Sequence, residues 1–175
     1  EFRRVLFRSE VDISTMGLEA NGYVAFAIGG QFATKKLPEE KIIALCKRIQ
    51  QPIVLLGGPE DAVVAKHIAE HTSNTTNACG LFNLNQSASL VKQARLVISH
   101  DTGLMHIAAA FRRRIVSVWG NTVPELGMTP YYGNKEVAQL QAQVFGLSCR
   151  PCSKIGHQKC PKGHFRCMLE QDQEL

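Results

Sequence analysis

Short apolar runs alternate with amphipathic stretches along most of the chain. The apolar runs predict buried strands at residues 22–28, 52–56, 78–82, 96–99 and 115–119, with a polar turn over 73–77. Between them, apolar residues recur at helical spacing, which predicts helices at residues 38–49, 60–71, 86–94 and 103–111. Strands that alternate with helices over short connections are typical of a parallel sheet covered on both faces. The expected fold is therefore α/β, a Rossmann-like doubly wound parallel sheet of about five to six strands.

The residues of chemical interest follow the strands. Two strands end in paired glycines, Gly29-Gly30 and Gly57-Gly58, and the polar turn SHDTG at residues 99–103 connects a third strand to its helix. All strands of a parallel sheet end at the same edge, so these turns converge on one crevice. Paired glycines allow a ligand close to the backbone, and a helix start offers free N–H groups to an anion.

A polar loop after the first strand adds Thr34, Lys35 and Lys36 to this edge. Threonine and lysine beside glycine-rich turns and helix starts favour a phosphate or pyrophosphate, although solvated loop charge explains the two lysines equally well. The first strand is not followed by GxGxxG, and the sequence contains no P-loop motif. A standard NAD site or NTPase is therefore not supported.

The densest polar cluster is DTGLMH at residues 101–106. A helix cap explains Asp101 or Thr102, and a satisfied core histidine explains His106, but a cap needs only one of these residues. The element resembles that of glycosyltransferase family 9, the ADP-heptose:lipopolysaccharide heptosyltransferases, and the similarity extends over roughly residues 22–168. Members are two-domain GT-B enzymes. This chain is similar only to their carboxyl-terminal, nucleotide-sugar-binding half.

The resemblance implies a donor site formed by Thr34, Lys35, Gly58, Glu60, Asp101, Thr102, Gly103 and His106. In it, Thr102 and Gly103 hold the diphosphate through backbone N–H groups. Asp101 faces the sugar rather than acting as the general base, and His106 supports the turn or the phosphates.

The other implied residues lie on the opposite wall. Thr34 and Lys35 contact the phosphates, and the loop at residues 83–87 lies near the adenine. Glu60, or alternatively Asp61, meets the ribose or only starts a helix.

The activity that the resemblance implies is transfer of a heptose from ADP-heptose to a lipopolysaccharide core acceptor, without a cofactor. The expected location is the cytoplasm, at the inner face of the inner membrane, with peripheral membrane contact. The general base belongs to an amino-terminal domain that we do not find here. We therefore assign no catalytic residue, and expect this chain to bind ADP or an ADP-sugar without turning it over alone.

Two alternative functions remain open. One is a GT-B-like enzyme, a transferase or an epimerase, that uses another sugar nucleotide. The other is a non-catalytic zinc module that binds nucleic acid through its basic tail. The net charge of +5 is concentrated near the ends, and the body of the chain is almost neutral. A basic face over the body is typical of nucleic-acid binders, so nucleic acid is disfavoured.

Three segments differ in composition. We expect residues 1–9 to be an artificial leader from cloning or sequence assembly, residues 10–146 to be the Rossmann-like domain and residues 147–175 to be a basic, cysteine-rich tail. Between residues 137 and 169 the basic residues are Arg150, Lys154, Lys159, Lys162 and Arg166, without an acidic one. A solvated basic loop or an approach to an anionic acceptor explains them equally well.

Four of the six cysteines lie in the tail, and the other two, Cys46 and Cys79, are expected in the core. The tail cysteines are Cys149, Cys152, Cys160 and Cys167. Their opening C-x2-C favours a structural zinc site, with free thiols next and a disulfide third.

Overall fold

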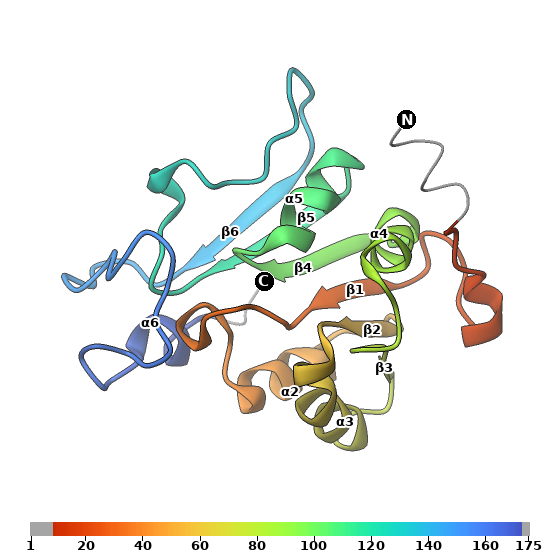
Figure 1. The fold of residues 1–175 in the computed structure, drawn as a ribbon, viewed down its shortest axis with the longest axis horizontal. Helices are drawn as coiled ribbons and strands as arrows, with labels where there is room; N and C mark the ends of the chain where they lie inside the picture. Colours follow the sequence, from red (N-terminus) through yellow and green to blue (C-terminus); the bar gives the residue numbers. More distant parts are fainter. Residues whose placement is uncertain (1–8, 173–175) are drawn as a thin grey trace.

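The protein is described by a computed structural model that covers residues 9–172. The leader expected at residues 1–9 therefore lies outside the described residues except for Ser9. Six parallel strands form one sheet in the order β3-β2-β1-β4-β5-β6, as Figure 1 shows. The strands are β1 (Val24–Ala27), β2 (Ile53–Leu56), β3 (Thr75–Asn77), β4 (Leu96–His100), β5 (Arg114–Trp119) and β6 (Gln139–Gln143). The predicted α/β fold with a doubly wound parallel sheet is confirmed.

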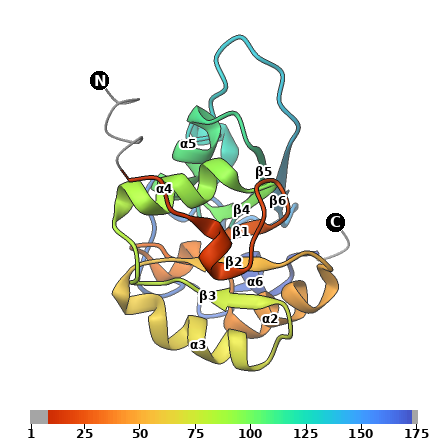
Figure 2. The same ribbon diagram turned by 90° about the vertical axis from the view of Figure 1, so that its right-hand side faces the viewer.

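Helices cover both faces of the sheet. The helices are α2 (Glu39–Arg48), α3 (Ala62–Glu70), α4 (Leu84–Gln93), α5 (Gly103–Ala110) and α6 (Arg166–Leu169). Figure 2 shows α4 and α5 on one side of the sheet and α2, α3 and α6 on the other. Each side has its own apolar core, because successive strand residues point to opposite faces. In β1, for example, Ala25 packs toward α4 and α5, whereas Phe26 packs toward α2 and α3.

The two edge strands differ from what the hydrophobic pattern predicts. The third strand is the polar segment Thr75–Asn77, and the prediction of a strand at 78–82 was wrong. β3 is partly exposed at the edge of the sheet, where strand pairing with β2 does not require apolar residues. The same holds for β6, which is polar and pairs with β5 at the opposite edge. The sequence analysis did not place this sixth strand.

The cysteine-rich tail packs against the sheet. Its short helix α6 places Cys167 and Met168 in the apolar core on the side of the sheet that α2 and α3 cover. The tail therefore belongs to the same folded body as the Rossmann-like domain. Within residues 9–172 we find no helix with the length and apolar character that crossing a membrane requires.

Candidate functional site

The turns that follow β1, β2 and β4 meet at one edge of the sheet, as the sequence predicts. Two cavities open there, a first cavity of about 490 Å³ and a second cavity of about 580 Å³. The first extends over the ends of β1 and β2 to Phe82, Leu84 and Leu104. Both cavities are lined by Gly30, Gln31, Thr102 and Gly103, so these residues join them.

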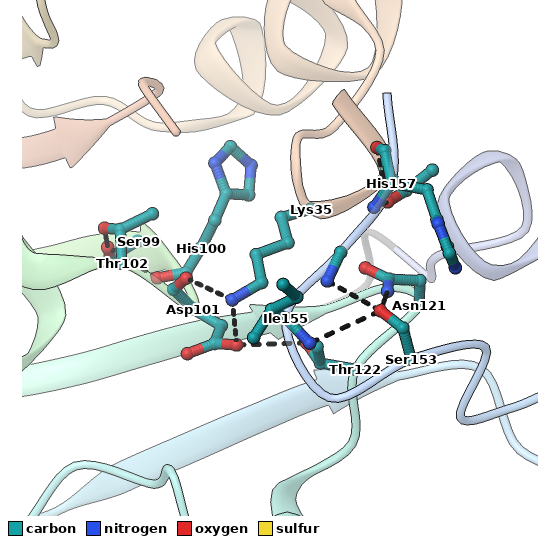
Figure 3. Close-up of polar contacts among 12 residues, drawn as sticks. Lys35, Ser99, His100, Asp101, Thr102, Asn121, Thr122, Ser153, Ile155 and His157 are labelled. Carbon is teal, nitrogen blue, oxygen red and sulfur yellow. Dashed lines mark hydrogen bonds and ion pairs between the residues drawn. The ribbon is translucent and has the colours of Figure 1, made fainter. Parts of the chain in front are cut away.

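The second cavity contains an ion pair between its two walls. Lys35 Nζ lies 2.6 Å from Asp101 Oδ2 and 3.3 Å from the Asp101 carbonyl oxygen. The hydroxyl of Thr122 donates to the same carboxylate oxygen at 3.1 Å, and Figure 3 shows both donors around Asp101. No residue in the range 9–172 donates a hydrogen bond to Asp101 Oδ1. Asp101 is therefore held in place and keeps an acceptor for a ligand in this cavity.

The start of α5 is open toward both cavities. Thr102 precedes the helix, but its side chain does not cap it, because its hydroxyl contacts Ser99 Oγ at 3.2 Å. Thr102 therefore occupies the N-cap position of α5 without capping the helix through its hydroxyl. The first N–H groups of α5 remain available to an anion at the junction of the cavities. A side-chain carbon added at Gly103 would meet nothing within 4 Å, so the backbone is accessible there.

His106 lies one turn into α5. It is exposed and lines the second cavity, so it is not a core histidine. Of the eight predicted donor residues, Lys35, Asp101, Thr102, Gly103 and His106 therefore meet around the second cavity.

The two acidic residues after β2 have different positions. Glu60 is exposed and, like Gly58, lines the first cavity. Asp61 is buried, accepts from the Gly58 N–H at 3.0 Å and pairs with Lys36 at 3.1 Å. A ribose contact by Glu60 stays a prediction. The solvated-charge explanation is wrong for both lysines, since Lys35 and Lys36 each pair with a carboxylate.

Asp61 also explains two of the glycines at this edge. A side-chain carbon at Gly29 would lie 2.5 Å from Asp61 Oδ2, and one at Gly57 would lie 2.7 Å from it. Only glycine allows both backbones to approach the buried carboxylate this closely. Asp61 thus connects the ends of β1 and β2 beneath the first cavity.

His100, which the sequence analysis did not select, supports the site from below. Its ring is fully buried, and its Nε2 accepts the Leu37 N–H at 3.0 Å. Burial lowers the pKa of His100 to about 4, so the imidazole is neutral near pH 7. The histidine thereby connects the Asp101 turn to the loop that carries Lys35. A polar residue at the end of a wholly buried strand was the available sequence signal.

Thr34 does not line either cavity. It is buried, donates to the His157 carbonyl at 2.9 Å and accepts the His157 N–H at 2.8 Å. Thr34, which was predicted to contact a phosphate, therefore lies at the junction between the β1 loop and the tail.

Arg150 connects the tail to the strand ends beside the site. Its guanidinium donates to the carbonyl oxygens of Trp119, Gly120, Thr122 and Val144 at 2.5 to 3.3 Å. These carbonyls lie at the ends of β5 and β6 and in the turn whose Thr122 holds Asp101. The interpretation of Arg150 as a solvated or acceptor-facing cation is therefore wrong.

The core cysteines are buried as expected, and burial raises the pKa of Cys46 to about 11 and of Cys79 to about 12. Among the described residues, the four tail cysteines form no disulfide. In the described part of the chain, no group of three or more histidine, cysteine or acidic side chains is arranged to hold a metal ion. Zinc binding by the tail stays a prediction, which metal analysis of the purified protein tests.

The comparisons with known proteins agree on one family. The profile of glycosyltransferase family 9 (heptosyltransferase) matches residues 8–160. Lipooligosaccharide heptosyltransferase 2 of Haemophilus ducreyi is 32% identical over 112 residues, which is 58% of this chain and 32% of that protein. Lipopolysaccharide heptosyltransferase 2 of Escherichia coli K12 is 27% identical over 121 residues, 64% of this chain and 34% of that protein. The chain thus spans about a third of the length of these curated relatives.

Two solved structures show where the fold recurs. E. coli ADP-heptose lipopolysaccharide heptosyltransferase II matches with a TM-score of 0.65 and 21% identity, over 90% of this chain and 49% of that one. E. coli heptosyltransferase WaaC with ADP-2-deoxy-2-fluoro heptose matches with a TM-score of 0.59 and 26% identity, over 79% of this chain and 40% of that one.

Proposed function

Because the chain belongs to glycosyltransferase family 9, we propose that it is the donor-binding half of an enzyme that transfers a heptose from ADP-heptose to a lipopolysaccharide core acceptor. The curated relatives are heptosyltransferases of lipopolysaccharide or lipooligosaccharide. The general base is expected outside this chain, in the amino-terminal domain that the family resemblance implies.

One observation carries the proposal: the open start of α5 lies where the two cavities join, beside the Lys35–Asp101 pair. In the proposed complex the diphosphate lies on the N–H groups at Thr102 and Gly103. The nucleoside then extends into the first cavity toward Glu60, and the sugar extends into the second.

In this arrangement the chain contributes mainly electrostatic stabilisation. Negative charge develops on the diphosphate as ADP leaves, and both the Lys35 ammonium and the positive end of α5 oppose it. Asp101 Oδ2 is already engaged by Lys35 and Thr122. We therefore assign Asp101 to orienting the sugar hydroxyls rather than to removing the acceptor proton.

Calorimetric titration of the chain with ADP, ADP-heptose and UDP tests the proposal. We expect ADP to bind more tightly than UDP, and Asp101→Ala to weaken ADP-heptose binding about tenfold, or about 1.4 kcal/mol. The matched control is Glu19→Ala, which removes an exposed carboxylate from a turn outside both cavities. A preference for UDP would favour an enzyme of another sugar nucleotide, and heptose transfer by this chain alone would contradict an external base.

The proposed acceptor is an anionic lipid, and the tail presents three exposed lysines, Lys154, Lys159 and Lys162, that can meet it. Arg166 is occupied by Glu170 at 2.6 Å. The cytoplasmic face of the inner membrane is accordingly the proposed location. Sedimentation with anionic and neutral vesicles, compared with a variant in which the three lysines are Gln, measures this contact. Salt-sensitive oligonucleotide binding that survives Asp101→Ala would instead support the nucleic-acid module.

A further inference from the structure

The tail loop, residues 152–157, forms one wall of the second cavity. Ile155 lines this cavity together with Lys35 and Asp101, although it lies 54 positions after Asp101 in the chain. The residue is 62% exposed, and Figure 3 shows it beside the ion pair. An apolar side chain thus lines this open cavity beside a lysine and a carboxylate.

Hydrogen bonds hold the tail loop in this position. Ser153 Oγ accepts the N–H of Ile155 at 3.3 Å and of Gly156 at 2.7 Å, and the Asn121 side-chain amide donates to the same oxygen at 3.2 Å. The Cys152 N–H donates to the Asn121 carbonyl at 3.0 Å. The loop is therefore attached to the turn that also carries Thr122, next to Asp101.

Gly156 attaches the other side of the tail loop. Its φ is +122°, and a side-chain carbon there would lie 2.5 to 2.9 Å from atoms of Phe32. The loop backbone thus packs directly on the Phe32 side chain, and Phe32 itself lines the second cavity. One residue further on, His157 bonds to Thr34 in both directions. Ile155 is consequently an exposed residue on a loop fixed at both ends.

The polarity of the second cavity indicates what fits against Ile155. Lys35, Asp101 and His106 supply polar groups to its lining, while Phe32, Met128 and Ile155 supply apolar surface. A sugar ring has the same division, because its hydroxyl groups project from the rim and its C–H groups cover a face. Hydroxyls suit a carboxylate and an ammonium, whereas the C–H face gains from burial against aliphatic carbon.

We propose that Ile155 is a specificity-determining residue that packs on the C–H face of the donor's sugar, and that Ser153 and Gly156 position it there. The proposal rests on the proposed function, since it presupposes a nucleotide-sugar in the two cavities. It adds that the tail acts on recognition of the sugar and not of ADP.

The test compares ADP with ADP-heptose by calorimetry on the full chain. In Ile155→Ala we expect unchanged ADP affinity and about five- to tenfold weaker ADP-heptose binding, because several partly buried carbons are removed. Ile155→Leu restores most of the loss, since aliphatic contact is what matters. Ser153→Ala, which releases the loop but keeps Ile155, gives a smaller loss of the same kind. Val63→Ala is the matched control, because Val63 is 79% exposed on α3 and lines neither cavity.

The outcomes separate this inference from the proposed function. Wild-type protein that binds no ADP overturns the proposed function, and this inference with it. Wild-type preference for ADP-heptose that Ile155→Ala fully retains overturns the inference alone. An equal loss of ADP and ADP-heptose in Ile155→Ala also overturns it, because the tail loop would then act on the fold of the site rather than on the sugar.

Discussion

Because of the buried histidine behind the site, we expect the protein to lose stability as the pH falls into the mildly acidic range. His100 accepts the Leu37 N–H, and burial lowers its pKa from 6.5 to about 4. The Gly29 backbone opposes this shift, Lys36 adds to it, and Asp61 opposes it in smaller measure. In the unfolded chain the same imidazole titrates near its ordinary value. Between these two pKa values the unfolded state binds a proton that the folded state does not, so stability falls as pH decreases from about 6.5 to about 4.

The size of the effect follows from the two pKa values. A shift of one pKa unit corresponds to about 1.4 kcal/mol, so the whole shift is worth roughly 3 kcal/mol once the pH is below both values. Most of it, about 2 kcal/mol, is lost between pH 8 and pH 5. Few carboxyl groups titrate in that range, which makes it the best window for measurement.

Urea denaturation of wild type and His100→Gln at pH 8, 6 and 5 measures this contribution. Glutamine cannot be charged, and its amide oxygen can accept the Leu37 N–H in place of Nε2. Wild type should lose about 2 kcal/mol more than the variant between pH 8 and pH 5, although the variant is less stable at pH 8. Equal losses in the two proteins would refute the reasoning, because the exposed histidines contribute identically to both.

Three further substitutions probe the site. Gly57→Ala should cost about 1 to 3 kcal/mol in urea denaturation, because the added carbon meets Asp61 at 2.7 Å; a neutral result contradicts the packing. Gly103→Ala, with open space around it, should leave stability unchanged or higher but weaken ADP binding in calorimetry; unchanged affinity would remove Gly103 from the site. Arg150→Lys should lower stability by about 2 kcal/mol or more and weaken ADP-heptose binding, since an ammonium cannot reach four carbonyls and the Thr122 turn loosens. If Arg150→Lys kept the full stability and affinity of the wild type, the positive charge alone would explain the role of Arg150, and the four hydrogen bonds would not.

Local signals were sufficient for most of the fold. β1, β2 and the first three residues of β4 are continuous apolar runs because both faces of a central parallel strand are buried, so these strands are unambiguous in the sequence. The edge strands β3 and β6 lack this constraint. Their residues are polar, and the apolar segment after β3 was therefore mistaken for the strand.

The candidate site was predictable to a similar extent. Lys35, Asp101, Thr102, Gly103 and His106 were found because parallel strands place their following turns at one edge. The direction of individual side chains was not predictable. Glu60 and Asp61 are neighbours of the same charge and both line the first cavity, yet Glu60 is exposed and Asp61 is buried against two glycines. The choice depends on the approach of Gly29 from another strand, which no local pattern records.

By itself, the sequence determined the alternation of strands and helices and the edge at which the polar turns gather, because both follow from short-range periodicity and from the geometry of parallel sheets. Only the tertiary structure decided what completes the site. Thr34 bonds to His157 across 123 positions, and Arg150 reaches the ends of β5 and β6, which brings Ile155 to the second cavity. Such contacts join segments that lie far apart in the sequence, so local periodicity does not predict them. They depend on how the whole chain packs.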